Sequence, residues 1–319
     1  MNRTNRWLLL SCALIISGLI ICYISYFLLG FDIRKFNNIS YVTNTYEITE
    51  SFSSIDIDTD SDDLSFVLSP DNSCKVICYE NEAEPHKINV KDDTLVIRES
   101  AELINKWHFS FNSEKMNIVI YLPKAEYDRL SINSDTGDIE TDKYFQFENI
   151  DITTDTGDVK LLSSARNDIT IKSDTGKFSI SDISGEDMEL KSDTGRIELN
   201  RIALSGDLNI KANTGKVILD NVKCKDFTSD GDTGSLILNY VVASGDIDFR
   251  RDTGSIELND SDAQNIKVRT DTGKVDGTLL SGKVFEVKSD TGRINVPASS
   301  DGGKCEIRTD TGNITIRIK

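Results

Sequence analysis

The sequence predicts an all-β protein, a parallel β-solenoid (β-helix-like) of about ten coils of 19–20 residues, preceded by one transmembrane α-helix. Three observations lead to this fold. Asp-Thr-Gly, once replaced by Asn-Thr-Gly, occurs ten times, and its glycines are always 19 or 20 residues apart. A fixed period of this length is typical of arrays in which each repeat forms one turn. Apolar and polar residues alternate on both sides of each glycine, as in strands with one buried face. An uncharged apolar run near the N-terminus predicts the helix.

Each repeat is predicted to supply two short strands that meet at the Asp-Thr-Gly. The buried residues lie at odd offsets before the glycine and at even offsets after it. This change of face indicates a corner, because glycine reaches left-handed conformations without a Cβ clash. The aspartate is expected to accept hydrogen bonds from backbone N–H groups in the turn. We interpret these corner residues as structural: Asp135, Gly137, Asp155, Gly157, Asp174, Gly176, Asp193, Gly195, Asn213, Gly215, Asp232, Gly234, Asp252, Gly254, Asp271, Gly273, Asp290, Gly292, Asp310 and Gly312.

Basic residues recur four positions before the glycine, between two acid-rich positions of the same strand face. Stacked coils would align them into a stripe, with acidic columns on either side. We favour an interpretation in which these columns compensate one another's charge. The alternative is that a polyanion, such as a wall polymer or an acidic glycan, lies along the stripe. Its residues are Lys172, Lys191, Lys211, Arg250, Arg269, Lys288 and Arg308.

The N-terminal region is predicted to anchor the chain in a membrane. Residues 7–29 form an uncharged run of 23 residues, which is long enough to cross a bilayer. Basic residues flank the run equally, so they do not fix its orientation. A short polar N-terminus before a large acidic domain favours a single-pass cell-membrane protein, with residues 1–6 in the cytoplasm and the C-terminal domain extracytoplasmic. Residues 30–45 are expected to be a juxtamembrane linker.

The solenoid is expected to have two parts. Residues 46–125 are strand-like without the period, and they predict irregular β-rich coils that cap the membrane-side end of the array. Residues 126–319 are predicted to form the regular solenoid. The chain stops in a strand pattern around Ile316, with no cap. An uncovered edge can pair with another molecule, so we hypothesise self-association through the C-terminal coil.

The composition excludes several classes of function. The formal net charge of −17 argues against a nucleic-acid partner. The six cysteines show no disulfide framework, since Cys74 and Cys78 lie too far apart along one strand to form a bridge. Only two histidines occur, His86 and His108, and no metal-ligand spacing is visible. We therefore predict no cofactor and no metal site.

Two motifs invite an enzymatic or calcium-binding interpretation. Asp-Thr-Gly also surrounds the catalytic residues of aspartic proteases, but that chemistry needs two adjacent carboxylates that share one proton. Ten copies, one per corner, do not provide that pair. Asp58, Asp60, Asp62 and Asp63 resemble the start of an EF-hand loop, but the loop's glycine and terminal glutamate are missing. A solvated strand face is the favoured interpretation of these four residues.

Taken together, these motifs resemble a known family. The apolar span, the lead-in that ends at 120–124 and the segment 130–139 with its repeats are similar to the bacterial putative adhesin family, over roughly residues 46–319. The resemblance implies an envelope protein with a β-strand-repeat fold, in a family with some members linked to envelope-stress responses. It implies no catalytic residues.

The favoured function is a membrane-anchored extracytoplasmic β-solenoid that is not an enzyme and acts as an adhesin-like or cell-envelope scaffold. One alternative is envelope-stress sensing, or sequestration of cationic peptides or wall polymers, by the acidic rod. A glycan-active enzyme is a further alternative, because many parallel β-helices act on glycans. It requires paired carboxylates in a cleft, and the sequence distinguishes none from the repeats.

Overall fold

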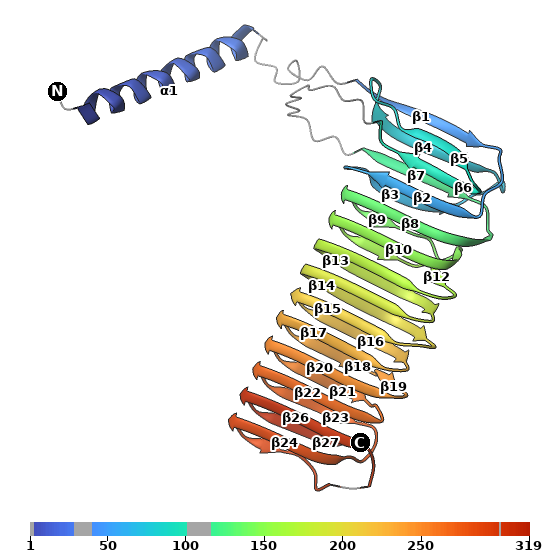
Figure 1. The fold of residues 1–319 in the computed structure, drawn as a ribbon, viewed down its shortest axis with the longest axis vertical. Helices are drawn as coiled ribbons and strands as arrows, with labels where there is room; N and C mark the ends of the chain where they lie inside the picture. Colours follow the sequence, from blue (N-terminus) through green and yellow to red (C-terminus); the bar gives the residue numbers. More distant parts are fainter. Residues whose placement is uncertain (1–2, 29–39, 101–115, 300) are drawn as a thin grey trace.

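The computed structural model describes residues 3–28, 40–100, 116–299 and 301–319 (Figure 1). It contains one helix, α1 (Arg3–Leu28), and 27 strands that belong to a single sheet. In the part of the chain that the structure describes, no helix is long and apolar enough to cross a membrane. Most of the predicted linker, residues 30–45, lies outside the described residues, and Tyr41–Thr45 already belong to β1 (Tyr41–Ile48).

The sheet coils into a β-solenoid, so the predicted fold class is confirmed at this level. Each coil has one long side before the corner glycine and a second side after it. The first side consists of β6 (Thr94–Arg98), β2 (Ser54–Thr59), β8 (Glu126–Thr136), β10 (Gln146–Thr156), the first halves of β13 (Ile169–Gly185) and β14 (Met188–Leu204), β15 (Leu208–Thr214), β17 (Phe227–Thr233), β20 (Asp246–Thr253), β22 (Asn265–Thr272), β26 (Lys304–Thr311) and β24 (Val284–Thr291).

The second side stacks in the same order as the first. It consists of β7 (Asn117–Leu122), β3 (Asp63–Leu68), β9 (Ile139–Glu140), β11 (Val159–Leu161), the second halves of β13 and β14, β16 (Val217–Cys224), β18 (Leu236–Asn239), β21 (Ile256–Ser261), β23 (Val275–Leu279), β27 (Ile314–Ile318) and β25 (Ile294–Asn295). Short pairings of β12 (Ser164–Ala165) and β19 (Val242–Ala243) with neighbouring coils form a third segment.

The ten corner glycines stack on one another in a single column. A Cβ added at each would lie 1.5–2.1 Å from the backbone oxygen of the residue below it in the stack. For Gly215, that oxygen belongs to Gly195 and the distance is 1.5 Å. Several of these glycines also have positive φ, such as 151° at Gly215. Only a residue without a side chain fits at this corner.

A second corner follows six residues after the glycine in five successive coils. Its residues adopt a left-handed backbone conformation, with φ between 48° and 60°, although none of them is glycine. Such conformations are uncommon for residues with a Cβ, so this corner carries no glycine signal in the sequence. The residues are Asp182, Arg201, Asn221, Tyr240 and Asp260.

The N-terminal end of the solenoid combines regular coils with an antiparallel cap. Strands β2 and β3 form a coil beneath β8 and β9, and Asp62 occupies the corner position under Gly137. Strands β6 and β7 continue both sides by one further level. β5 (Lys87–Lys91) then pairs antiparallel with β6, whereas β4 (Cys74–Asn81) and β1 pair antiparallel beyond β7. The antiparallel strands close this end.

At the other end, the stacking order differs from the chain order. β26 lies between β22 and β24, and β27 lies between β23 and β25. The C-terminal coil is therefore internal, and the coil that contains β24 and β25 forms the end of the stack (Figure 1). The premise that the C-terminal coil presents the free edge is wrong. Ile316 is 2% exposed, whereas Ile294 in the terminal coil is 45% exposed.

Glycines and a buried ion pair accompany this exchange of coils. A Cβ at Gly303 would lie 1.6 Å from the carbonyl oxygen of Gln264, so the returning chain passes very close to the preceding coil. The Lys283 side chain is 3% exposed and pairs with Asp262 at 2.7 Å. Both features fix the path by which the chain leaves the stack and returns to it.

Aliphatic columns fill the interior between the two sides. Small residues and hydroxyls occupy the inward position three residues before the glycine, for example Ser192 and Thr309. Arg251 interrupts this column and is 1% exposed. Its guanidinium donates to Ser229 Oγ at 2.8 Å, and the neighbouring Gly231 leaves room for it.

Candidate functional site

The corner aspartates and Asn213 are exposed or half-exposed, and all lie along one edge of the stack. The backbone N–H of the corner glycine donates to a carbonyl of the adjacent coil, as Gly157 does to Thr175 at 3.0 Å. Some of the aspartates have side-chain partners: Asp193 accepts from Asn213 at 2.8 Å, and Asp290 pairs with Lys288 at 2.8 Å. The corner column brings no two of its carboxylates together in a buried pair within the described residues.

Other aspartates accept backbone hydrogen bonds from the next coil. Asp187 Oδ1 accepts from the N–H of Asp207 at 2.6 Å, and Asp226 Oδ1 accepts from that of Asp246 at 2.7 Å. These residues lie at the corner that precedes the long side of each coil. The same bonding occurs beside the corner glycines, where Asp138 Oδ1 accepts from the N–H of Asp158 at 2.9 Å and Asp158 Oδ1 accepts from that of Lys177 at 2.8 Å. These acceptors follow the corner glycine, whereas the predicted acceptors precede it.

The seven basic residues of the predicted stripe are exposed, and six of them occupy one column with Asp230 between Lys211 and Arg250. Lys288 continues the column in the terminal coil. Five of the seven form ion pairs, for example Lys191 with Glu189 at 2.5 Å and Arg308 with Glu306 at 3.0 Å. The pairing within the described residues favours charge compensation. Exposed pairs of this kind each contribute little to stability.

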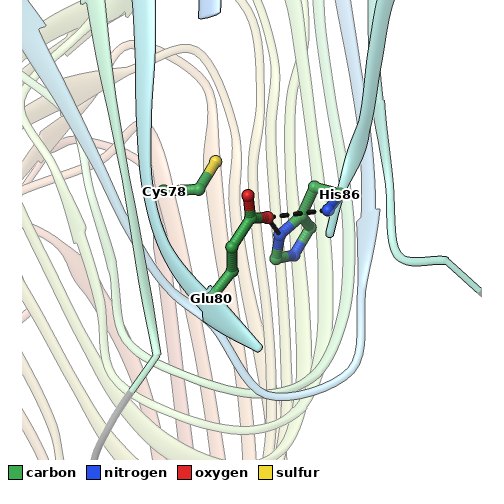
Figure 2. A group of neighbouring side chains, drawn as sticks. All are labelled: Cys78, Glu80 and His86. Carbon is green, nitrogen blue, oxygen red and sulfur yellow. Dashed lines mark hydrogen bonds and ion pairs between the residues drawn. The ribbon is translucent and has the colours of Figure 1, made fainter. Parts of the chain in front are cut away.

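A buried polar cluster lies in the N-terminal cap, at the end of the corner column. It contains Asp62, Cys78, Glu80 and His86, and Figure 2 shows the last three. Cys78 and Glu80 are two residues apart on β4, so both side chains point to its inner face. His86 follows the turn after β4, and Asp62 lies at the corner between β2 and β3. Both carboxylate side chains are fully buried, and the imidazole is 3% exposed.

The histidine ring lies between the two carboxylates. Nδ1 of His86 is 2.5 Å from Oε2 of Glu80, and Nε2 is 3.0 Å from Oδ2 of Asp62. The backbone N–H of His86 also donates to Oε2 at 2.7 Å. The other oxygen of Glu80 accepts from Asn44 Nδ2 and from the Tyr46 hydroxyl, each at 2.7 Å. Oδ1 of Asp62 has no hydrogen-bond partner among the described residues.

These contacts determine how the cluster is charged. Burial alone lowers the pKa of His86, but its hydrogen bonds and the charges of Asp62 and Glu80 outweigh burial and raise it to about 9. Burial opposes ionisation of Glu80 as well, yet its hydrogen bonds hold its pKa below the usual range. Burial raises the pKa of the Cys78 thiol far above its usual value. As described, the group is an imidazolium between two carboxylates.

A further carboxyl group lies beside this cluster. One oxygen of Glu99 accepts from the backbone N–H of Asp60 at 3.2 Å. Burial, followed by the charges of Asp60 and Asp62, raises the pKa of Glu99 to about 7. The N-terminal corner therefore concentrates negative charge, and His86 is the only cation in the hydrogen-bonded cluster among the residues that the structure describes.

The sequence pattern did not indicate this cluster. The interpretation of the four aspartates as a solvated face holds for Asp58 but is wrong for Asp62, which is 0% exposed. The three segments that meet there lie outside the regular period, so no column relates them. The one available signal was the two-residue spacing of Cys78 and Glu80 on an otherwise apolar strand face.

Comparisons with known proteins identify one family and several similar solved structures. A family model described as Toastrack DUF4097 matches residues 52–215 and 202–319. The chain is similar to the solved structure of a putative adhesin from Bacteroides fragilis, with 18% identity, 88% of this chain and 97% of that chain covered, and a TM-score of 0.45. It is also similar to a putative lipid binding protein from Parabacteroides distasonis, with 15% identity, 85% and 96% covered, and a TM-score of 0.46. No curated protein matches the chain.

Proposed function

Since the chain belongs to the Toastrack DUF4097 family, we propose that it acts as a membrane-anchored extracytoplasmic scaffold, adhesin-like and non-catalytic. The observation that carries this proposal is the repeated outer surface of the solenoid. Exposed corner residues and a column of charged residues recur along the stack, and five of the seven basic residues in that column form ion pairs. A repeated, self-compensated surface suits an extended contact or spacer better than a single reaction centre.

The described part of α1 supports the anchor. From Leu14 to Leu28 its large apolar side chains are exposed around the whole helix, with Leu14 at 67%, Ile20 at 53% and Leu28 at 77%. A helix that is apolar on all sides needs an apolar environment, either a protein core or a bilayer. The uncharged run continues toward Trp7 in the sequence, which gives the length that a bilayer requires.

Fractionation and labelling of the full chain in a bacterial host test this proposal. The chain should remain in carbonate-washed membranes, and a cysteine introduced by Asp232→Cys should react with a membrane-impermeant maleimide added to spheroplasts. Ile16→Arg/Ile20→Arg should release the chain, because charges at the bilayer centre are costly. The matched control, Ile16→Leu/Ile20→Leu, should remain membrane-bound. A wild-type chain found in the soluble fraction, or labelled only after lysis, would contradict the proposal.

The negative net charge favours a second candidate function, the capture of cationic peptides. Arg3 and Arg6 are the only charged residues before Asp32, so the remainder of the chain carries a formal charge of −19. Fluorescence anisotropy of an oligolysine peptide with the full chain in detergent tests this candidate. Binding at low salt should disappear at about 0.5 M salt, because screening shortens the range of the attraction. No binding at low salt, or equal binding of an oligoglutamate control, would exclude it.

A further inference from the structure

We propose that Cys78, Glu80 and His86 form a buried binding site for a divalent transition-metal ion of the zinc class. One ligand atom from each residue, Sγ, a carboxylate oxygen and a ring nitrogen, can be chosen so that all three lie within 4.8 Å of one another. Figure 2 shows the three side chains converging from β4 and the segment that follows it. Thiolate, imidazole and carboxylate are the ligands that zinc takes in proteins.

The cluster holds two buried carboxylates, which are groups that a cation can bind. Glu80 and Asp62 are both fully buried, and among the described residues His86 is the only basic side chain bonded to them. Even with the imidazole protonated, the three groups carry one excess negative charge inside the cap. Buried charge is unfavourable unless it is compensated. A divalent ion bound by the Cys78 thiolate and the Glu80 carboxylate, beside a neutral imidazole and the Asp62 carboxylate, keeps this net charge of −1 and takes the place of two protons, one from the thiol and one from the imidazole.

Asp62 provides a second, independent observation. It is 0% exposed, and its Oδ1 has no hydrogen-bond partner among the described residues. Its other oxygen lies 3.0 Å from Nε2 of His86. Histidine ligands commonly donate their second ring N–H to a carboxylate, which fixes the ring and its tautomer. Asp62 is placed to orient His86 while Nδ1 faces the ion.

The partners of Glu80 fit the same assignment. Asn44 and Tyr46 donate to Oε1 and hold the carboxylate in place, while Oε2 faces Nδ1 of His86. The ion would replace the proton between Oε2 and Nδ1, which are now 2.5 Å apart. With metal–ligand bonds of about 2.0–2.2 Å, these two atoms must separate to roughly 3 Å or more.

Cobalt binding to the full chain in detergent tests the site. We expect one equivalent of Zn²⁺ per chain by elemental analysis after dialysis, and Co²⁺ substitution should give the near-ultraviolet sulfur-to-cobalt absorption. Cys78→Ser should abolish that absorption, and His86→Gln should weaken metal binding at least tenfold. The matched control is Cys74→Ser, because Cys74 is also buried on the inner face of β4 but is not in the group. This control should retain both signals.

The wild-type chain alone can overturn the proposal. A folded chain that retains no Zn²⁺ and gives no sulfur-to-cobalt absorption would show that the cluster is a closed hydrogen-bonded group. Loss of the absorption in Cys74→Ser, or its persistence in folded Cys78→Ser, would place the metal elsewhere. If Cys78→Ser does not fold, Cys78→Ala provides the same absorption readout, and circular dichroism establishes which variant is folded.

Discussion

At the scale of single residues, the corner glycines are defined by contact with the coil below. At Gly215 a Cβ would lie 1.5 Å from the oxygen of Gly195, and φ is 151°. No side-chain rotation relieves that contact, because the obstacle is backbone. The repeated glycine is therefore a steric requirement of stacking, and its conformation allows close approach of neighbouring coils.

Gly215→Ala should destabilise the solenoid by at least about 2 kcal/mol, through the clash and the strained backbone. Gly185→Ala is the matched control, because a Cβ there would lie 3.3 Å from the nearest backbone atom. It should cost less than about 1 kcal/mol. Chemical denaturation measures both values. Equal losses for the two variants would show that the corner column is not the constraint.

Glu99 gives the cap a pH dependence. Its pKa rises from 4.5 to about 7 on folding, because of burial and of the charges of Asp60 and Asp62. Below pH 4.5 the group is protonated in both states and has no effect. As the pH rises from 4.5 to about 7, the unfolded state loses its proton first, so the free energy of unfolding falls.

Glu99→Gln should remove this fall, so the variant should have a higher Tm than the wild type at pH 7.5 and a similar Tm at pH 4. Thermal unfolding at both pH values measures the difference. Glu82→Gln is a suitable control, because the pKa of Glu99 is set by burial beside Asp60 and Asp62, and Glu82 is an exposed residue. A Tm difference between wild type and Glu99→Gln that is the same at both pH values would contradict the assignment.

At the scale of elements, the exchange of the last two coils is the main departure from a simple repeat. Ile314 and Ile294 occupy the same column and are paired in register, but Ile314 is 0% exposed and Ile294 is 45% exposed. The two residues therefore report which coil ends the stack. Chain-order stacking would reverse their environments.

Ile314→Lys should cost about 3–5 kcal/mol, because it buries an unpaired charge between two coils. Ile294→Lys should cost less than about 1 kcal/mol, because the new charge reaches solvent at the end of the stack. Chemical denaturation of the two variants measures both values. A larger loss of stability for Ile294→Lys than for Ile314→Lys would indicate that the coils stack in chain order, with the C-terminal coil at the edge.

The sequence predicted the elements that repeat and missed those that do not. The alternation around Gly176 or Gly195 specifies strands and a corner, because every coil faces the same neighbours. The corner at Arg201 was invisible, since its left-handed backbone is not marked by glycine. The residues of the last two coils fit the same columns in either order, so the sequence does not reveal which coil ends the stack. The cluster around His86 depends on cap segments that share no period.

At the scale of the whole molecule, the solenoid is a stack closed by an antiparallel cap at one end and by an exchanged coil at the other (Figure 1). Each end thus departs from the regular repeat, as terminal repeats generally do. The terminal strands β24 and β25 keep a free edge, with Val284 48% exposed. Charged residues such as Glu286 and Lys288 flank that edge, a common protection against pairing with other chains.

The central claim is that the corners stack in one line, with the coil of Asp290 beyond that of Asp310. Pulsed dipolar spectroscopy between nitroxides at position 155 and at 193, 232, 271, 310 or 290 tests it most directly, in a chain with Cys12 and Cys22 replaced by serine. At about 4.8 Å per coil, we predict separations of roughly 10, 19, 29, 34 and 38 Å in that order. Separations that do not rise along this series, or a label at 290 nearer than one at 310, would contradict the account.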